Sequence, residues 1–480
     1  MVFSSTVFLF LFLPIVLTGY YLIPISRLRN IFLLGCSLFF YAWGEGIYIV
    51  LMLVSIGMNY SGTLILTGYR GHARARFVLV LLICANLLLL GAFKYANFAA
   101  DNVNVIFGSL HVPQLALPVI HLPIGISFFT FQAMSYVIDV YRNDAKVQYN
   151  PLDCGLYIAL FPQLIAGPIV RYHDIADQLT ERFHTLERFT SGVKPFTLGL
   201  GKKMLIANPM GLIADQIFAL PHAELSAPLA WSGVAAYTLQ IFFDFSGYSD
   251  MAIGLGRLFG FEFPINFNYP YIARSFRDFW RRWHISLSSW FRDYLYIPLG
   301  GNRLGPYRTC CNLFLVFFLC GLWHGANWNF IIWGMMHGIF MVLERGAWGR
   351  ILATLWLPVR HLYVMLGVMV GWVIFRSNDL DSAISYLNAM FGLAAASVDL
   401  QPLGLYWSRY TVVVFVIGVG LCLPLYPLVE KGILMIGRKR EGWIQSLLSM
   451  TNIVVIIAIL LASAMELAVA THNPFIYFRF

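Results

Sequence analysis

The sequence has little charge for its length. Charged residues make up 11% of the 480 positions and hydrophobic residues 59%, whereas ordinary soluble domains carry roughly 25% charged residues. This shortage of charge excludes water as the main solvent of the folded chain. Because a helix needs about 20 mainly apolar residues to cross a membrane, the composition indicates a protein that crosses the bilayer many times.

Cysteine is also scarce, with seven residues in the whole chain. They lie mostly in or beside apolar runs and lack the spacing of paired metal ligands, so we expect packing cysteines, no disulfide framework and no metal site. A signal-peptide pattern is missing too. The first apolar stretch, 2–24, has no basic residue before it and no small-residue cleavage site after it, so we expect a retained helix.

Long apolar runs fill most of the chain. Since unpaired backbone groups are too costly in lipid, the runs predict an all-α polytopic protein, with about ten or more transmembrane helices in a single membrane-embedded domain over residues 1–480. Glycine and proline at 122–127 and 166–168 predict broken or re-entrant helices there. The runs lie at 5–24, 30–66, 77–94, 116–141, 151–170, 190–220, 228–262, 309–323, 326–347, 351–376, 404–430 and 446–470.

The net charge of +9 is concentrated in short connections between apolar runs, such as 70–76 and 438–440. By the positive-inside rule, these connections are expected on the cytoplasmic side. A nucleic-acid partner is the competing interpretation of a basic chain. The basic residues flank membrane spans and form no basic domain, so we expect membrane lipid and no nucleic acid as a partner.

The segment 274–295, RSFRDFWRRWHISLSSWFRDYL, is rich in arginine and tryptophan. Its apolar residues recur at helical spacing, Arg277 and Arg281 lie on the opposite side, and His284 lies beside the apolar stripe. This pattern is typical of a helix at the membrane surface, with aromatic anchors and arginines that reach anionic lipid. A second interpretation stays open, in which His284 faces a reaction cavity and the arginines attract a phosphate-bearing donor such as a coenzyme A thioester.

A histidine follows the apolar run that ends near residue 323. His324 stands between Gly321 and Gly325, and an ionisable residue in such a place faces a cavity or a partner. A neutral histidine hydrogen-bonded between helices is one interpretation. The flanking glycines, which let a backbone or a ligand approach closely, favour a functional one.

Histidine suits general-base work near neutral pH, and a hydroxyl group that accepts an acyl group needs such a base. We therefore take His324 as the candidate base. His337 is a second candidate. It lies thirteen residues further on, where a continuous helix points it about 140° away, so we expect a structural or supporting role.

The run at 242–250 places carboxylates and hydroxyl groups within apolar sequence. The carboxylates have three possible tasks: to orient a histidine, to pair with an arginine or to bind a cation. Structural polar groups between helices give the same pattern, so both interpretations stay open. The candidates are Asp244, Ser246, Tyr248 and Asp250.

These segments together resemble the membrane-bound O-acyltransferase family. The resemblance lies in FFDFSGYSDMAIGLG, FWRRWHISLSSWFRDYLYIPLGGNR and GLWHGANWNFIIWGMMHG, and it extends to 122–142 and 161–171. The chain is most similar to members that take part in O-acetylation of alginate and other bacterial exopolysaccharides, including cellulose.

The resemblance implies a helical bundle around a thin centre, with amphipathic and re-entrant helices and a tunnel between the two faces. His324 matches the invariant histidine of the family and His284 its second histidine, so both are catalytic candidates. The remaining assignments are donor-binding roles for Arg277, Arg281, Arg282, Trp283, Asn302 and Arg303, and supporting roles for Asp244, Ser246, Tyr248, Asp250, Asn327 and His337.

The function that the resemblance implies is an O-acetyltransferase of the bacterial inner membrane. It takes an acetyl group from a cytoplasmic thioester, expected to be acetyl-CoA, and passes it across the membrane to periplasmic acetyltransferase or carrier proteins. No permanently bound cofactor is expected. Alginate, cellulose, another exopolysaccharide and, more distantly, D-alanyl transfer to teichoic acid remain open. The alternatives are a transporter of an acyl donor or glycan, disfavoured by the lack of an internal repeat, and a scaffold whose histidines only pack.

Overall fold

The long apolar runs form helices. The structure, a computed structural model, describes residues 1–393, 402–425, 442–469 and 475–476, and every regular element in these ranges is helical. The predicted all-α class is therefore confirmed for the described residues. The basic connection at 438–440 lies outside them.

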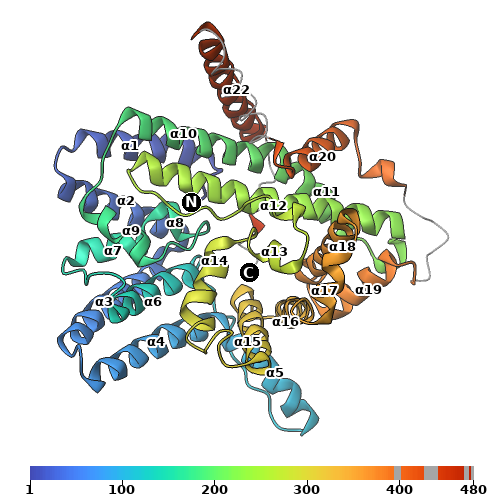
Figure 1. The fold of residues 1–480 in the computed structure, drawn as a ribbon, viewed down its shortest axis with the longest axis horizontal. Coiled ribbons are helices and arrows are strands. Elements are labelled where there is room, and N and C mark those ends of the chain that lie inside the picture. The colour runs from blue at the N-terminus through green and yellow to red at the C-terminus, as the bar shows by residue number, and fades with distance from the viewer. Residues whose placement is uncertain (394–401, 426–441, 470–474, 477–480) are drawn as a thin grey trace.

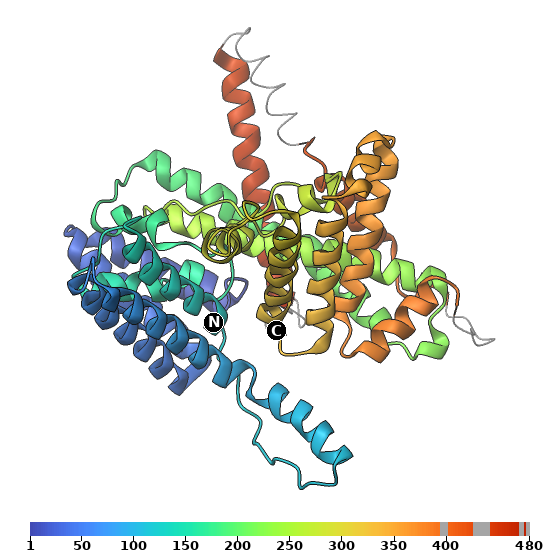
Figure 2. The same cartoon turned by 60° about the horizontal axis from the view of Figure 1, so that its bottom comes forward.

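The N-terminal part is a group of helices on one side of the molecule (Figure 1). The chain begins with a π-helical segment, Phe8–Phe12, which continues into the first α-helix. The elements are α1 (Leu13–Leu22), α2 (Ser26–Glu45), α3 (Ile49–Gly68), α4 (Ala73–Lys94), α5 (Ala96–Ser109), α6 (Ile126–Arg142), α7 (Pro151–Ala159), α8 (Phe161–Leu164) and α9 (Tyr172–Thr180). Figure 2 shows that α5 and the segment after it project from the body of the molecule.

The centre of the molecule is a long helix, α12 (Ala227–Leu258), packed against α10 (Leu186–Gly201) and α11 (Asn208–Phe218). Glycines bring α10 and α12 together. An added Cβ at Gly192 comes within 2.8 Å of the Gly254 carbonyl oxygen, and one at Gly247 within 2.7 Å of the Gly199 carbonyl oxygen. Small residues let the two backbones approach closely, so α12 packs tightly against α10.

Much of the C-terminal part lies at the opposite end of the molecule from α1 to α4, with α17, α18 and α19 on the right of Figure 1, while α22 projects at the top. The C-terminal part contains the short helices of the arginine-rich segment, an antiparallel pair and the last long helices. The elements are α13 (Phe276–Trp280), α14 (Ile285–Phe291), a π-helical segment (Arg292–Tyr296), α15 (Pro306–His324), α16 (Trp328–Leu343), α17 (Ala347–Thr354), α18 (Leu357–Arg376), α19 (Leu380–Met390), α20 (Arg409–Leu421) and α22 (Gly442–Val469).

In the described part of the chain, five helical stretches are long and apolar enough to cross a membrane. Three shorter apolar helices accompany them, at Phe8–Leu22, Trp328–Leu343 and Arg409–Leu421. The five are Ser26–Gly68, Ala73–Lys94, Pro306–His324, Leu357–Arg376 and Ser446–Val469. Together they confirm a protein built of apolar helices.

Both predicted helix interruptions are confirmed. The chain is not helical before Ile126, where Gly125 has φ +78°, nor between α8 and Tyr172, where Gly167 has φ +123°. Glycine reaches these left-handed conformations without a steric penalty, which is why the interruptions fall at these positions.

The prediction of one helix over 274–295 is wrong. The segment forms α13 and α14 with a break between them, and His284, at the break, has φ +44°. The break is held by main-chain hydrogen bonds with the segment 266–268: Asn268 N–H donates to the Arg282 carbonyl, and Ile285 N–H donates to the Asn266 carbonyl. Helical periodicity cannot reveal such a partner from another part of the chain.

The tryptophans of this segment are also buried inside the protein. Trp280, Trp283 and Trp290 expose between 4% and 7% of their surface. Trp283 packs on Phe279 and Trp372, with ring centroids 5.6 and 4.9 Å away. The interpretation of these side chains as headgroup anchors is therefore wrong, because neighbouring helices cover them.

Candidate active site

His324 is the last residue of α15, where the chain reverses into α16. Its side chain is buried, with 6% of the surface exposed. Three aromatic rings surround the imidazole: Trp323 and Trp333, both 5.0 Å away between centroids, and Phe375, 5.3 Å away. The buried Nδ1 atom has no hydrogen-bond partner among the described residues. The imidazole is thus held by packing and keeps a ring nitrogen for chemistry.

A buried cation secures the end of α15. Lys94 Nζ donates to the carbonyl oxygens of Trp323 (2.6 Å) and His324 (3.2 Å) and to Ser127 Oγ (3.2 Å). The last carbonyls of a helix lack partners within the helix, and a positive charge there also complements the helix dipole. Lys94 therefore fixes the backbone that carries His324.

His284 precedes α14 and is 1% exposed. Its ring lies 4.7 Å from that of Phe245 on α12 and 6.1 Å from that of Trp323. Since the same Trp323 ring lies 5.0 Å from His324, the fold brings the two catalytic candidates to one indole. They come from segments forty positions apart, so this proximity is created by the fold.

His337 lies on α16 in an aromatic enclosure. Its ring centroid is 4.9 Å from Trp333 and 5.1 Å from Trp280. The sequence expectation used a continuous helix from 324 to 337, and that premise is wrong because the helix stops at His324 and restarts at Trp328. Trp333 contacts both histidines. His337 thus packs on a ring that also contacts His324, which is compatible with a supporting role.

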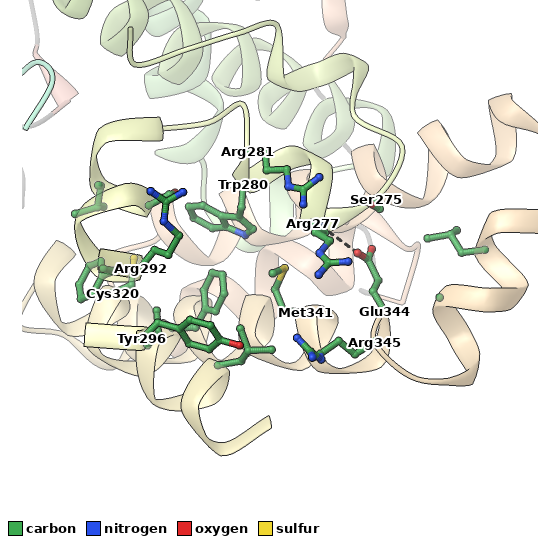
Figure 3. Close-up of a pocket in the computed structure, with 18 of the residues that line it drawn as sticks. Ser275, Arg277, Trp280, Arg281, Arg292, Tyr296, Cys320, Met341, Glu344 and Arg345 are labelled. Carbon is green, nitrogen blue, oxygen red and sulfur yellow. Dashed lines mark hydrogen bonds between the residues drawn. The ribbon is translucent and has the colours of Figure 1, made fainter. Parts of the chain in front are cut away.

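A cavity of about 430 Å³ lies among α13 to α17 (Figure 3). Its wall includes Ser288, four residues after His284, and Cys320, four residues before His324. Since four residues make about one helical turn, the wall reaches within one turn of each catalytic candidate. Five arginines contribute to the lining: Arg277, Arg281, Arg292, Arg345 and Arg360.

Glu344 is the acidic residue of this lining. Its carboxylate accepts hydrogen bonds from the backbone N–H groups of Phe276 (2.7 Å) and Arg277 (3.0 Å) at the start of α13 (Figure 3). Burial raises the pKa of Glu344, and these two hydrogen bonds oppose the shift. The carboxylate is thus used to cap α13, and the excess of positive charge in the cavity remains.

The donor-binding candidates fall into two groups. Arg277 and Arg281 line the cavity, while Arg282 pairs with Asp278 at 2.8 Å and Trp283 packs against Trp372. Asn302 and Arg303 are exposed outside the lining.

Sequence reasoning missed the arginines that other elements contribute to the cavity. Arg345 follows α16 and Arg360 lies on α18, far along the chain from 274–295. An arginine directly after an apolar helix is a weak signal, because such residues usually mark only a membrane boundary.

Two of the supporting candidates on α12 are carboxylates that form ion pairs with lysines. Asp244 forms a buried ion pair with Lys203 at 2.7 Å, and Asp250 pairs with Lys202 at 2.6 Å. Asn327 caps α16 by accepting a hydrogen bond from Asn329 N–H. Ser246 and Tyr248 are buried on the same helix as Asp244, and their hydroxyl oxygens have no hydrogen-bond partner among the described residues.

Basic residues of several elements gather on one face. Arg70 donates to the Val140 carbonyl, and Arg142 and Arg171 both donate to Asp293, which follows the cavity arginine Arg292. The turn between α3 and α4, the end of α6 and the cavity residue Arg292 therefore lie together. Lys94, at the other end of the 22-residue α4, contacts His324, so His324 lies toward the opposite face.

The fold and the site define a helical membrane protein with a histidine pair beside an arginine-lined cavity. The profile of the MBOAT, membrane-bound O-acyltransferase family, matches residues 79–376. The chain belongs to this family. The predicted family membership is confirmed.

Curated relatives agree with this assignment. The chain is 42% identical to "Probable alginate O-acetylase AlgI" of Azotobacter vinelandii over 100% of both chains. It is 38% identical to "Peptidoglycan O-acetyltransferase" of Helicobacter pylori over 83% of this chain and 81% of the relative, and 28% identical to "Teichoic acid D-alanyltransferase" of Bacillus subtilis over 58% and 74%. The family and these relatives confirm the predicted enzyme class, an O-acetyltransferase in a multi-pass membrane protein.

Proposed function

We propose that this protein takes an acetyl group from a cytoplasmic thioester, acetyl-CoA, and passes it across the bacterial inner membrane for O-acetylation of a secreted exopolysaccharide such as alginate. Full-length similarity to alginate O-acetylases supports this acceptor class. The proposal includes a bundle of about ten or more crossings and a tunnel that joins the two faces. Periplasmic acetyltransferase or carrier proteins receive the acetyl group.

One observation carries the proposal: an arginine-lined cavity of about 430 Å³ whose wall comes within one helical turn of both His284 and His324. Guanidinium groups bind phosphate oxygens through paired, charge-assisted hydrogen bonds. The apolar part of the lining, such as Leu287 and Val316, suits the uncharged arm of a coenzyme A thioester. The donor thus binds with its phosphates at the arginines and its thioester toward the histidines.

The chemistry follows from the histidines. The acceptor hydroxyl attacks the thioester carbonyl carbon, a C–O bond forms, the C–S bond breaks, and the thiol leaves after taking up a proton. A neutral imidazole at His324 accepts the hydroxyl proton, because a hydroxyl group is a poor nucleophile while it keeps that proton. His284, whose ring lies 6.1 Å from the same Trp323 indole, assists by stabilising the developing negative charge or by returning a proton.

The two ends of the site fit a transfer across the membrane. The cavity residue Arg292 lies at the basic face, which the positive-inside rule assigns to the cytoplasm. His324 lies toward the other end of α4, beside Lys94. The donor therefore enters from the cytoplasm, and the acetyl group leaves on the periplasmic side.

Replacement of His324 tests the proposal. His324→Ala is expected to lower polymer acetylation, measured by mass spectrometry of the secreted polysaccharide, at least about 100-fold, as is typical for loss of a general base. Protein abundance in the membrane is expected to stay normal. His121→Ala is the control, because His121 is half-exposed and pairs with Glu45 away from the cavity.

A second assay separates the enzyme from a transporter. Purified protein in sealed proteoliposomes is expected to release free coenzyme A thiol from acetyl-CoA in the presence of acceptor, and His324→Ala is expected to lose this release. Acetylation that persists in the variant contradicts the role of His324. Movement of acetyl-CoA without thioester cleavage favours the transporter.

A further inference from the structure

Asn266 joins three separate segments around His284. It is 1% exposed and lies in the non-helical segment after α12. Its Nδ2 group donates to Ser249 Oγ on α12 (3.0 Å) and to the Gly167 carbonyl (3.4 Å). Its Oδ1 atom faces His284 Nδ1 at 3.0 Å and accepts from the backbone N–H of Ser286 at 3.2 Å.

These partners fix the orientation of the Asn266 amide. A backbone N–H can only donate and a backbone carbonyl can only accept, so the atom beside Ser286 is the oxygen and the atom beside Gly167 is the nitrogen. The two ends require the same orientation. The oxygen is therefore the atom that faces His284.

The orientation of the amide determines where His284 carries its proton. An amide oxygen has no hydrogen to donate, so Nδ1 of His284 must be the donor. In the neutral ring the lone pair is then on Nε2. That atom is buried and has no hydrogen-bond partner among the described residues.

Asn266 also holds the backbone of His284. Its carbonyl oxygen accepts from Ile285 N–H at 3.0 Å, directly after the left-handed conformation of His284, φ +44°. A non-glycine residue pays a steric cost in this conformation. Main-chain and side-chain hydrogen bonds from one residue therefore stabilise both the turn and the ring.

We infer that Asn266 is the positioning residue of His284: it selects the tautomer with the lone pair on Nε2 and aims that atom at the acyl-transfer site. The inference rests on the proposed function, because it assumes that His284 takes part in the reaction. Ser286 assists by donating from Oγ to Asn266 Oδ1 at 2.9 Å. Asn266 itself does not touch the reactants.

The groups that face His284 set the expected pH response. A titratable group near His284 is His324 on α15, because both rings lie beside the Trp323 indole. Behind it, Lys94 on α4 contacts the carbonyl oxygens of Trp323 and His324. Phe245 on α12 is uncharged. A carboxylate in place of the Asn266 amide thus becomes the nearest negative charge to the imidazole.

Two variants of Asn266 test the inference in nanodisc-reconstituted protein, with acetyl-CoA as the probe. Asn266→Ala is expected to lower kcat at least about tenfold, which is part of the rate enhancement that a positioned acid–base group contributes. KM for acetyl-CoA is expected to stay unchanged. Asn266→Asp is expected to keep part of the activity and to shift the acid limb of the pH–rate profile to higher pH, since a carboxylate stabilises the protonated imidazole.

Asn86→Ala is the matched control. Asn86 is 1% exposed and pairs with Asn59 between α3 and α4, away from the histidines. Its loss is expected to lower thermal stability as much as Asn266→Ala does, while the pH–rate profile stays that of the parent. A purely structural Asn266 gives the same result as Asn86, with no shift in Asn266→Asp, and this outcome overturns the inference.

His284→Ala separates this inference from the proposed function. If His284→Ala keeps full activity, the role of His284 fails and the inference fails with it. If His284→Ala is inactive while Asn266→Ala keeps parental kcat and pH profile, the proposed function stands and only the positioning role of Asn266 is overturned.

Discussion

Lys94 is a buried cation that supports the backbone of the candidate active site. It is 8% exposed, at the end of α4, and its ammonium group binds the carbonyl oxygens of Trp323 and His324. Without this group, the last carbonyls of α15 lose charged hydrogen bonds in an apolar setting. The position of His324 therefore depends on a residue 230 positions earlier in the chain.

We predict that Lys94→Met destabilises the protein by about 1.5–3 kcal/mol, the usual value of hydrogen bonds to a charged group, and lowers acetyl transfer. Thermal unfolding of the detergent-purified protein measures the first effect. The matched control is Lys202→Met, which removes an ion pair with Asp250 whose side chains are 31% and 32% exposed; a solvent-exposed pair is worth less than about 1 kcal/mol. Equal melting temperatures for Lys94→Met and the parent contradict the prediction.

His173 gives the protein a pH-dependent contact on the basic face. The hydrogen bond with Asp139, 2.9 Å from Nδ1, raises the pKa of His173 above its ordinary value of 6.5, while partial burial opposes the shift. Because the folded pKa is the higher one, protonation of His173 stabilises the fold fully below about 6.5, and this contribution is lost as the pH rises through the folded pKa.

We therefore predict that the melting temperature falls as the pH rises above about 6.5, and that His173→Gln removes this part of the pH dependence. Differential scanning fluorimetry across that range measures it. An unchanged slope in the variant shows that the stabilisation comes from another group.

At the scale of elements, the pair α15 and α16 depends on glycine. An added Cβ at Gly321 collides with the Phe330 carbonyl oxygen, and one at Gly334 collides with the Phe317 carbonyl oxygen. Both contacts are with backbone, which cannot move aside as a flexible side chain can. Close approach of these two helices is what places Trp333 against His324.

We predict that Gly334→Ala destabilises the protein by about 1–3 kcal/mol through overpacking and reduces acetyl transfer. Gly91→Ala on α4 is the control, because nothing lies within 4 Å of its added Cβ. Thermal unfolding and acetyl-CoA cleavage are measured on both variants. If the two behave alike, the close approach of α15 and α16 is not required.

At the scale of the whole molecule, charge distribution sets the orientation in the membrane. Arg70, Arg142 and Arg171 belong to different elements but lie on one face with the cavity residue Arg292. The helix α5 follows Lys94 at the other end of α4 and projects from the body (Figure 2). The basic face and the projecting helix are thus on opposite sides of α4.

We predict that Ser109→Cys is labelled by a membrane-impermeant maleimide in intact cells, whereas Gly71→Cys is labelled only after lysis, by the positive-inside rule. The parent protein is the control, because Cys84 and Cys311 are exposed in the structure. The reverse pattern of labelling places the basic face outside the cell and contradicts the cytoplasmic donor.

The sequence by itself determined that the chain folds in a membrane, that its structure is helical, and that His324 is the main candidate for the chemistry. Composition alone indicates apolar helices, and an ionisable residue between glycines, His324, stands out in such a chain. Glycines with positive φ fall where the breaks at 122–127 and 166–168 were predicted. These properties are local, so they can be read from neighbouring residues.

Only the tertiary structure decided which residues meet. It broke the segment 274–295 at His284, brought Asn266 and Lys94 to the histidines, and added Arg345 and Arg360 to the cavity. Each of these contacts joins parts of the chain that are distant in sequence. Periodicity reports the face of one helix, whereas a catalytic site depends on the packing of several, and that packing is fixed by contacts across the whole fold.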